Sequence, residues 1–277
     1  VNTSGGNISI AGNITSTGRD EIVSLSDGTG NGTITLGGTV TSGDITLIGD
    51  SGISIAGDIT SNKDGAAGAI AFTGPVTLTG DVIVTADDHT DSTITFNSTS
   101  TVNASSSGGQ SLTLDTDAGA IAMQGAIGGS TALNALTVNN DGAGTIEITN
   151  IGTSSAAGVT GATAIGNTNT GTLTLDGTVY TTTAGQTYTA ASGQNIDITN
   201  TSGTTFTTTN TAVAFNTSGV DLNNNGTTTI NTGTGAGAVT FDGALESNGG
   251  NNDLLVITSG AGDVTFTGTV GATNPLG

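Results

Sequence analysis

The stretch Ile8-Ser9-Ile10-Ala11-Gly12-Asn13-Ile14 sets the pattern of this chain. Apolar and polar residues alternate through its first three positions, a glycine follows, and another aliphatic residue stands two places after the glycine. Alternation with a period of two predicts a β-strand with one buried face. Most of the apolar positions along the chain carry β-branched or aromatic residues, which favour strands. Each copy of the pattern therefore predicts a short strand, a corner and a second short strand.

The alternating core recurs twelve times, at spacings from 17 to 27 residues. The first apolar residues of the copies are Ile8, Ile34, Ile53, Ile70, Ile94, Ile121, Ile146, Leu173, Ile196, Val213, Val239 and Val264. The second are Ile10, Leu36, Ile55, Phe72, Phe96, Met123, Ile148, Leu175, Ile198, Phe215, Phe241 and Phe266. A period in this range, built from short strands, is typical of a β-solenoid. We expect an all-β parallel β-solenoid of about twelve coils, about 55–60 Å long at about 4.8 Å per coil.

Equivalent residues of successive coils stack in a solenoid, so the two apolar positions predict two inward columns. Phe72 is expected beside Phe96, and Phe215 beside Phe241, with five of the six Phe residues in one column. The core residues predicted in this way include Ile34, Leu36, Phe72, Phe96, Phe215, Phe241 and Phe266.

A glycine follows the core at a fixed offset in eight of the twelve copies. These glycines are Gly12, Gly38, Gly57, Gly74, Gly125, Gly177, Gly243 and Gly268. Asn150 and Asn200 hold the same offset elsewhere. Gly, and after it Asn, best tolerates a backbone with positive φ. The pattern therefore predicts a corner with positive φ after each core.

A second, longer repeat divides the chain. The ten residues from Gly119 to Gly128 match those from Gly262 to Gly271 without gaps, 143 residues apart. The first six cores map onto the last six at offsets of 138 to 145 residues. We therefore expect two continuous tandem modules of six coils each, residues 1–143 and 144–277, with insertions placed in the returns.

The composition excludes several classes of protein. The chain has 2 basic residues against 22 acidic ones, for a net charge of −20. Nucleic acids and anionic membrane surfaces are bound through Lys and Arg, so neither is an expected partner. No apolar run is long enough to cross a membrane, and we expect no membrane insertion. Cysteine is absent, which excludes a disulfide framework.

Two stretches carry a likeness to known repeats: residues 262–272, Gly-Asp-Val-Thr-Phe-Thr-Gly-Thr-Val-Gly-Ala, and residues 135–140, Ala-Leu-Thr-Val-Asn-Asn. They resemble the repeats of very large secreted bacterial proteins related to filamentous haemagglutinin and the autotransporter adhesins. The resemblance implies a right-handed parallel β-helix, export across the outer membrane, and a role in surface fibres, adhesion or biofilm.

Two polar clusters are candidate calcium sites. Asp221, Asn223 and Asn225 match the start of an EF-hand-like loop, but Thr232 stands where that loop needs a bidentate Glu. The alternative is a strand that runs into an Asn-rich turn. Asp87, Asp88 and Asp91 form the densest acidic cluster, for which the alternative is a solvated loop. No cofactor other than Ca²⁺ is expected.

Three further functions were tested against the sequence. Tyr180 and Tyr188 are the candidate sugar contacts, since carbohydrate recognition relies on aromatic platforms. Ice binding needs an outward column that is regularly Thr, but Glu147 and Asp197 interrupt the residues between the two core positions. Catalysis by paired carboxylates needs two acids across one cleft. Asp115 and Asp117 sit together, but their counterparts in the second repeat are Thr258 and Gly260.

The sequence as a whole predicts a structural segment of a fibre or adhesin stalk, extracellular and on the cell surface, and not an enzyme. Its expected partners are copies of itself, end to end or laterally, or further repeats of a longer chain. The alternative is a ligand-binding adhesin module that binds glycans or calcium through the loops between coils.

Overall fold

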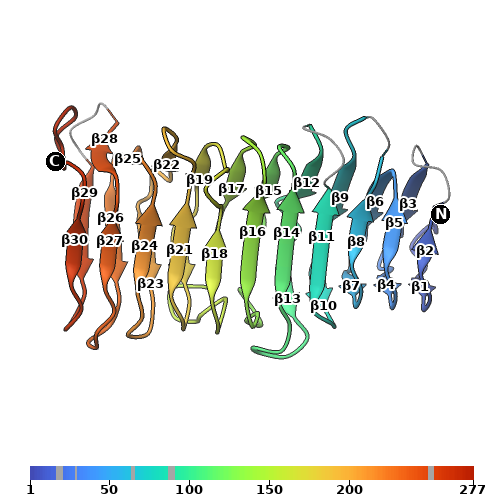
Figure 1. Ribbon diagram of the computed structural model, residues 1–277. Helices are drawn as coiled ribbons and strands as arrows, with labels where there is room; N and C mark the ends of the chain where they lie inside the picture. Colours follow the sequence, from blue (N-terminus) through green and yellow to red (C-terminus); the bar gives the residue numbers. More distant parts are fainter. Residues whose placement is uncertain (17–20, 29, 64–65, 87–90, 249–252) are drawn as a thin grey trace.

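The computed structural model describes residues 1–16, 21–28, 30–63, 66–86, 91–248 and 253–277. Within these ranges the chain is all-β, and its strands pair in parallel. They stack into a β-solenoid of about 10 turns, with the two termini at opposite ends of the rod (Figure 1). No helix in the described ranges is long and apolar enough to span a membrane.

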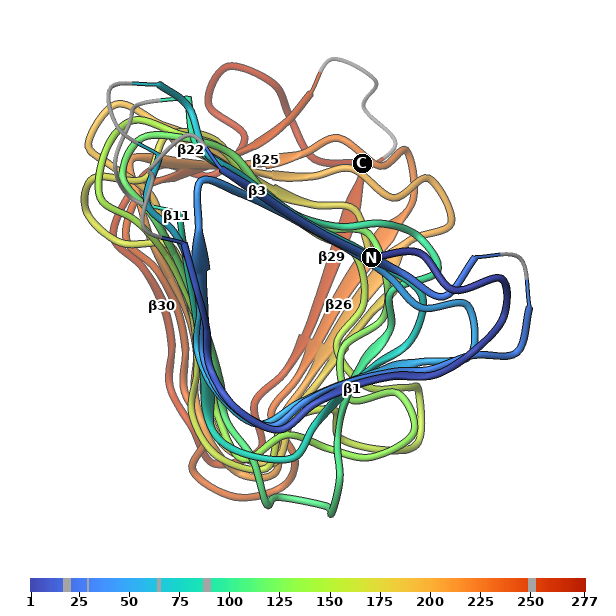
Figure 2. The same ribbon diagram turned by 90° about the vertical axis from the view of Figure 1, so that its right-hand side faces the viewer.

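Each coil runs along three faces, so the rod is triangular in cross-section (Figure 2). In that view from the N-terminal end, the chain passes from β1 (Ile8–Ile10) through β2 (Ile14–Thr15) to β3 (Ile22–Ser26). The sense is clockwise as the coils recede from the viewer, so the solenoid is right-handed. We call the faces that begin with these three strands the first, second and third face.

The second and third faces are single sheets that run the length of the rod. The second contains β2, β5 (Val40–Ser42), β8 (Ile59–Ser61), β11 (Val82–Ala86), β14 (Leu112–Thr116), β16 (Leu136–Asn140), β18 (Thr163–Ile165), β21 (Gln186–Thr189), β24 (Val213–Asn216), β27 (Val239–Phe241) and β30 (Val264–Phe266). The third contains β3, β6 (Asp44–Ile48), β9 (Ala69–Thr73), β12 (Thr93–Phe96), β15 (Ile121–Met123), β17 (Ile146–Ile148), β19 (Leu173–Leu175), β22 (Asn195–Ile198), β25 (Gly219–Leu222) and β28 (Ala244–Ser247).

The first face is a sheet in two pieces. One piece holds β1, β4 (Ile34–Leu36), β7 (Ile53–Ile55), β10 (Val76–Leu78) and β13 (Val102–Ala104). The other holds β20 (Val179–Thr181), β23 (Thr204–Thr207), β26 (Thr227–Asn231) and β29 (Leu254–Thr258). Single parallel bridges through Ile127 and Ile151 join Val102 to Tyr180, so the column of residues on this face is continuous.

Loops at the corner between the first and second faces interrupt the regular coil in the middle of the rod. Leu133, Val159 and Thr182 from three such loops form their own parallel bridges. Leu133 and Val159 are fully buried, so these loops stack on one another as the strands do. The insertions predicted for the returns therefore leave the regular path of the coil but stack on one another from coil to coil.

Strands stack in register, and this register builds one continuous core. Phe72 stacks on Phe96 with ring centroids 4.2 Å apart, and Phe215 on Phe241 at 4.8 Å, which confirms both predicted neighbour pairs. The predicted core residues Ile34, Leu36, Phe72, Phe96, Phe215 and Phe241 are buried. Phe266 stacks on Phe241 but is 39% exposed, because no further coil covers it.

The solenoid has about ten coils instead of the predicted twelve, because the twelve alternating cores do not all lie on one face. Ile53 lies on the first face and Ile70 on the third, while Ile196 lies on the third and Val213 on the second. These two steps are the 17-residue spacings, and each covers two faces instead of a full turn. The expected single column of five Phe residues is therefore wrong. Phe72 and Phe96 line the third face, and the other three line the second.

The same change of face separates the two matching stretches. Ile121, in the first stretch, lies on the third face, and its counterpart Val264 lies on the second. An offset of 143 residues is therefore not a whole number of turns. Stacking continues without a break past residue 143, through the pairs β15–β17 and β16–β18. The division into modules 1–143 and 144–277 stays a prediction about the sequence.

Close stacking, and not positive φ, is the reason for most of the corner glycines. Of the eight, only Gly74 has positive φ, and Asn150 and Asn200 do not have it either. A Cβ added to Gly38 would lie 2.7 Å from the carbonyl carbon of Gly12, and one added to Gly57 would lie 2.7 Å from that of Gly38. Such distances are below any real Cβ contact, so the backbone of the preceding coil occupies the space. The predicted corners exist, but their physical reason is different.

Candidate functional site

Tyr180 and Tyr188, the predicted sugar contacts, lie in the core. Both side chains are fully buried, so neither ring is presented to a ligand, and this prediction is wrong. Tyr180 stacks on Phe206 at 4.9 Å and Tyr188 on Phe215 at 5.3 Å, with edge contacts between the two stacks. These two stacks fill the core between the first and second faces.

Hydrogen bonds explain how two hydroxyls are tolerated there. The Tyr180 hydroxyl donates to the Ile148 carbonyl at 2.7 Å and accepts from the Gly177 N–H at 2.8 Å. The Tyr188 hydroxyl donates to Oε1 of the buried Gln186 at 2.9 Å. Burial raises the pKa of both hydroxyls, so both remain protonated donors.

Replacing Tyr180 with phenylalanine should lower the free energy of unfolding by about 1–3 kcal/mol, because the Gly177 N–H would lose its acceptor. The Ile148 carbonyl would keep only the hydrogen bond from the Asp176 N–H. The measurement is urea unfolding followed by circular dichroism. An unchanged midpoint would contradict the assignment of this hydroxyl as a structural group.

The candidate calcium residues near Asp221 belong to a strand end and a corner. Asp221 points outward from β25, and the buried Asn224 makes the turn, with Nδ2 donating to Thr228 Oγ1 at 3.0 Å and Oδ1 accepting from the Gly226 N–H. Asn223 is exposed on the outer side, and Asn225 takes up the left-handed conformation with φ of 48°. This is the Asn-rich turn that was the alternative to a calcium loop.

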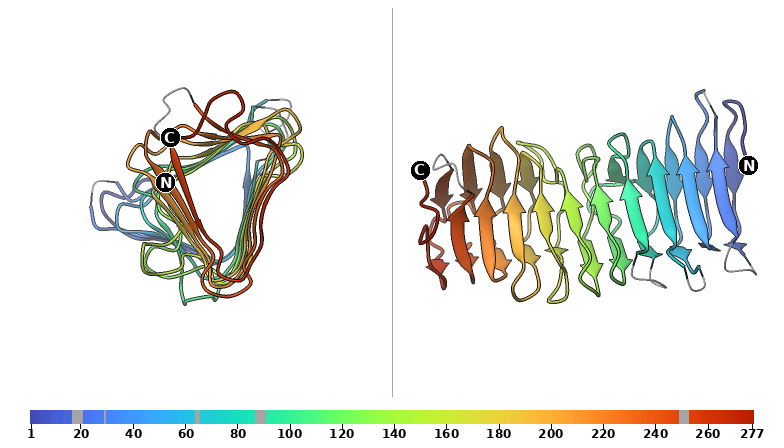
Figure 3. Two further views of the ribbon diagram at one scale, coloured as in Figure 1. Left: turned by 90° about the vertical axis from the view of Figure 1, so that its left-hand side faces the viewer. Right: turned by 90° about the horizontal axis from the view of Figure 1, so that it is seen from above.

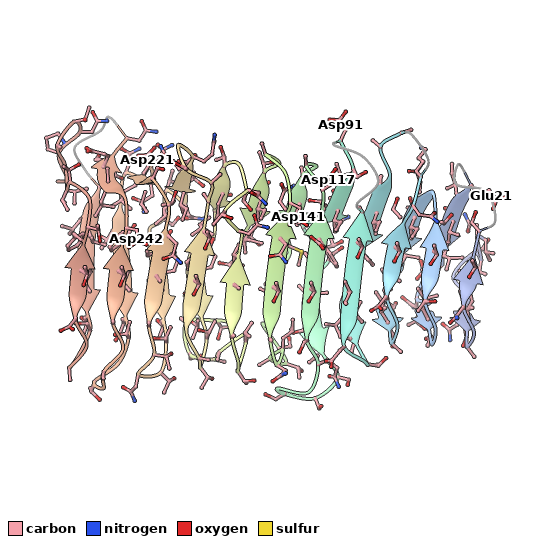
Figure 4. All side chains as sticks on the ribbon, in the orientation of Figure 1. Glu21, Asp91, Asp117, Asp141, Asp221 and Asp242 are labelled. Carbon is pink, nitrogen blue, oxygen red and sulfur yellow. The ribbon has the colours of Figure 1, made fainter. Side chains whose placement is uncertain are left out.

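The second candidate calcium cluster is only partly described. Asp87 and Asp88 lie outside the described residues. Asp91 is exposed and borders a shallow depression of about 350 Å³ with Gly119 and Gly144 (Figure 4). Over the ranges that the structure describes, no three acidic, His or Cys side chains are grouped to hold a metal ion. Calcium binding stays a prediction.

A ladder of carboxylates lies on the third face, towards the C-terminal end. Asp197, Asp221 and Glu246 occupy one outward column on β22, β25 and β28, and Glu147 and Thr174 precede them in the same column. In-register neighbours in a sheet are about 4.8 Å apart. Asn195 Nδ2 donates to Asp221 at 2.8 Å, and the Thr273 and Asn274 N–H groups donate to Glu246.

The pKa values of two ladder members are shifted in opposite directions, each by its own surroundings. Partial burial, together with the neighbouring Asp221 carboxylate, raises the pKa of Asp197. The backbone N–H groups of Asn274 and Thr273 lower the pKa of Glu246. The sequence placed Glu147 and Asp197 in one outward column but did not indicate that Asp221 and Glu246 continue it, because that continuation becomes visible only when each strand is assigned to its face.

Replacing Asp197 with asparagine should stabilise the protein at neutral pH by less than about 1 kcal/mol, since the group is partly exposed and screened. The folded state holds the Asp197 proton more tightly than the unfolded chain, so stability falls as pH rises through the window that begins near 3.8. The gain should therefore vanish below that window.

The matched control is Asp242→Asn on the second face, whose two neighbours in its column, Asn216 and Thr267, are uncharged. Thermal unfolding of both variants and the parent, measured from acidic to neutral pH, gives the test. A gain for Asp197→Asn that persists at the acidic end would contradict the ladder.

The near pair Asp115 and Asp117 borders a small depression at the corner between the second and third faces. Asp141 from the next coil also lines it, and Figure 4 labels Asp117 and Asp141. The volume of the depression is about 120 Å³. Asp141 accepts a hydrogen bond from Asn167 Nδ2 at 3.1 Å. The depression has the size of a few water molecules, and it presents three acids on one side of the rod.

The outward column considered for ice binding divides among the three faces. Its members from Ser9 to Ser54 lie on the first face, those from Ala71 to Asp197 on the third, and those from Ala214 to Thr265 on the second. The true outward column on the second face begins with Thr15, Thr41, Thr60 and Thr85 and then reaches Asp115. A carboxylate thus interrupts the longest uniform run of Thr on this face.

The two ends of the rod leave the core open. At the C-terminal end, Val264, Phe266 and Val270 are about two-fifths exposed although they occupy inward columns. At the N-terminal end, an apolar depression of about 300 Å³ is lined mainly by Ile10, Ile14, Ile22, Val23 and Leu25. Figure 3 shows both ends of the coil stack. Among the described residues, all the exposed large apolar side chains except Ile83 lie in these first and last coils.

Comparison with protein-family models, with curated proteins and with solved structures finds no match to this chain. The parallel β-solenoid therefore rests on the structure itself.

Proposed function

We propose that this chain is a structural rod segment of an extracellular bacterial fibre or adhesin stalk, which serves surface attachment, matrix formation or cell–cell contact. The observation that carries the proposal is the unbroken stacking of inward columns through about 10 turns. The proposal assigns no catalytic role.

The charge and the core support the proposal. A net charge of −20 with few basic residues produces electrostatic repulsion between neighbouring rods, which opposes lateral association and aggregation. Each coil contacts only its neighbours, so the rod can be lengthened without a change of fold. Burial of each large apolar side chain contributes about 1.5–3 kcal/mol, repeated along the rod.

Small-angle X-ray scattering of the 277-residue chain tests the rod. We expect an elongated particle about 50 Å long per chain, from about 10 turns of about 4.8 Å. Antibody labelling of intact cells of the source organism tests the location, and labelling only after lysis would contradict it.

The competing function is ligand binding through the loops between coils. Tyr180 and Tyr188 cannot contact a ligand in such a module, because both side chains are buried. A glycan array probed with the 277-residue chain separates the two functions. Binding that disappears when Asp91 or the loop of residues 105–110 is changed would replace the rod proposal by a ligand-binding module.

A further inference from the structure

We infer that the middle of the rod is a joint at which the first face opens and closes, with the corner between the second and third faces as its hinge. The joint lies between β13 and β20, where the sheet of the first face is broken. It is a property of the coil stack itself and holds whether or not the chain serves in a fibre. It gives an otherwise stiff rod one place and one direction of bending.

Within the described ranges, two coils are held on the first face by single bridges instead of strands. All three residues of β10, for comparison, pair with β7 on one side and with β13 on the other. At the coils of Ile127 and Ile151, one residue bridges to each neighbour. Two backbone hydrogen bonds join these coils on this face. The Ile127 N–H donates to the Asn150 carbonyl at 2.9 Å, and the Gly152 N–H donates to the Ile127 carbonyl at 2.8 Å.

Two glycines cut the strands short at these coils. Gly128 directly follows Ile127 and has φ of 66°, and Gly152 directly follows Ile151 and has φ of 73°. A residue in the left-handed region turns the chain out of a strand, so each coil leaves the first face after one paired residue. Neither position has room for a side chain. A Cβ on Gly128 would lie 1.9 Å from the Gly158 carbonyl oxygen, and one on Gly152 would lie 2.5 Å from the Gly158 nitrogen.

The loops that leave the face at these glycines do not replace its sheet. They stack on one another through Leu133, Val159 and Thr182, again by single bridges. The interior stays filled, because Ile127 and Ile151 are fully buried. Apolar packing is non-directional, whereas the hydrogen bonds of a strand ladder fix both distance and angle. The coils can therefore tilt against one another on this face without emptying the core.

The other two faces keep full ladders through the same coils. On the second face, β14, β16, β18 and β21 pair through at least three residues at every step. On the third face, β15, β17 and β19 do the same. These two sheets meet at one corner of the triangle, and the first face lies opposite that corner (Figure 2). Bending therefore pivots on that corner and changes the spacing between coils on the first face.

Pulsed electron–electron double resonance between two spin labels tests the joint, and the chain has no cysteine of its own to interfere. One variant combines Thr77→Cys with Thr207→Cys, at outward positions of the first face on either side of the joint. The matched control combines Thr113→Cys with Thr240→Cys, at outward positions of the second face. Each pair lies in one column and is separated by five steps of the stack, about 24 Å at about 4.8 Å per coil.

The first-face pair should give a wider distribution of distances than the second-face pair, because only the first face changes its coil spacing. Circular dichroism of both labelled variants checks that the fold is kept. Equal widths, or a wider distribution on the second face, would overturn the joint.

Hydrogen exchange of the unlabelled 277-residue chain gives a second test that needs no substitution. The amide protons of Ile127 and Gly152 should exchange at least about tenfold faster than those of Ile53 and Val76, which are hydrogen-bonded within full ladders of the same face. Similar protection of the two pairs would contradict the joint. That result would leave the proposed function standing, whereas a compact particle in X-ray scattering would overturn the rod whatever the exchange rates are.

Discussion

Replacing Phe241 with aspartate should lower the free energy of unfolding by at least about 3 kcal/mol, the usual cost of losing a buried Phe ring. Phe241 is buried between Phe215 and Phe266, at ring distances of 4.8 and 5.2 Å. The substitution removes both contacts and places a carboxylate in an apolar column without a partner. Urea unfolding followed by circular dichroism measures the loss.

The matched control is Thr240→Asp, the same change one residue earlier on β27. Thr240 points outward between Ala214 and Thr265, so its replacement should change stability by less than about 0.5 kcal/mol. Because each coil contacts only its neighbours, hydrogen exchange in the Phe241 variant should rise first in β24, β27 and β30. Equal effects of the two changes would contradict the inward and outward assignments.

Replacing Gly57 with alanine should destabilise the rod by about 1–3 kcal/mol, the range found when atoms are forced into a packed interior. The new methyl group would meet the carbonyl carbon of Gly38 at 2.7 Å and the Thr39 nitrogen at 2.9 Å. Both obstacles are backbone atoms of the coil below, so no side chain can move aside to make room.

Gly12→Ala is the control for this prediction, since a Cβ at Gly12 meets nothing within 4 Å. In dilute solution, where each chain is separate, this variant should unfold at the same temperature as the parent. Differential scanning calorimetry of both variants provides the comparison. A similar loss of stability at Gly12 and Gly57 would show that glycine is needed for backbone conformation and not for stacking.

The strands and their nearest neighbours could be predicted from the sequence, because alternation with a period of two is a local property. The stacking of Phe72 on Phe96 followed from it directly. The face on which each strand lies could not be predicted in the same way. The apolar–glycine–apolar pattern surrounds the corner after β1, the corner after β9 and the corner after β27 alike. An alignment of the pattern therefore passes from one face to another without a visible break.

The candidate sites were harder to predict, because their surroundings are not local. Tyr188 alternates with Thr187 and Thr189 as a core residue does, but Gln186 at the preceding inward position suggests a polar surface. Gln186 is buried because Nε2 donates to the carbonyls of Tyr180 and Thr207, at 2.8 and 3.0 Å. No property of the strand itself indicates those carbonyls.

The use of one pattern at all three corners has a consequence for how such a chain can change in length. A segment that spans one side of the triangle begins and ends with the same local geometry, so one side is interchangeable with the next. Insertions and deletions can therefore occur in steps of a third of a turn, and each such step rotates everything beyond it to the adjacent side. Related rods that differ by such steps would keep the same core residues but would present different combinations of outward residues on one face. The surface of such a rod can therefore evolve independently of its core.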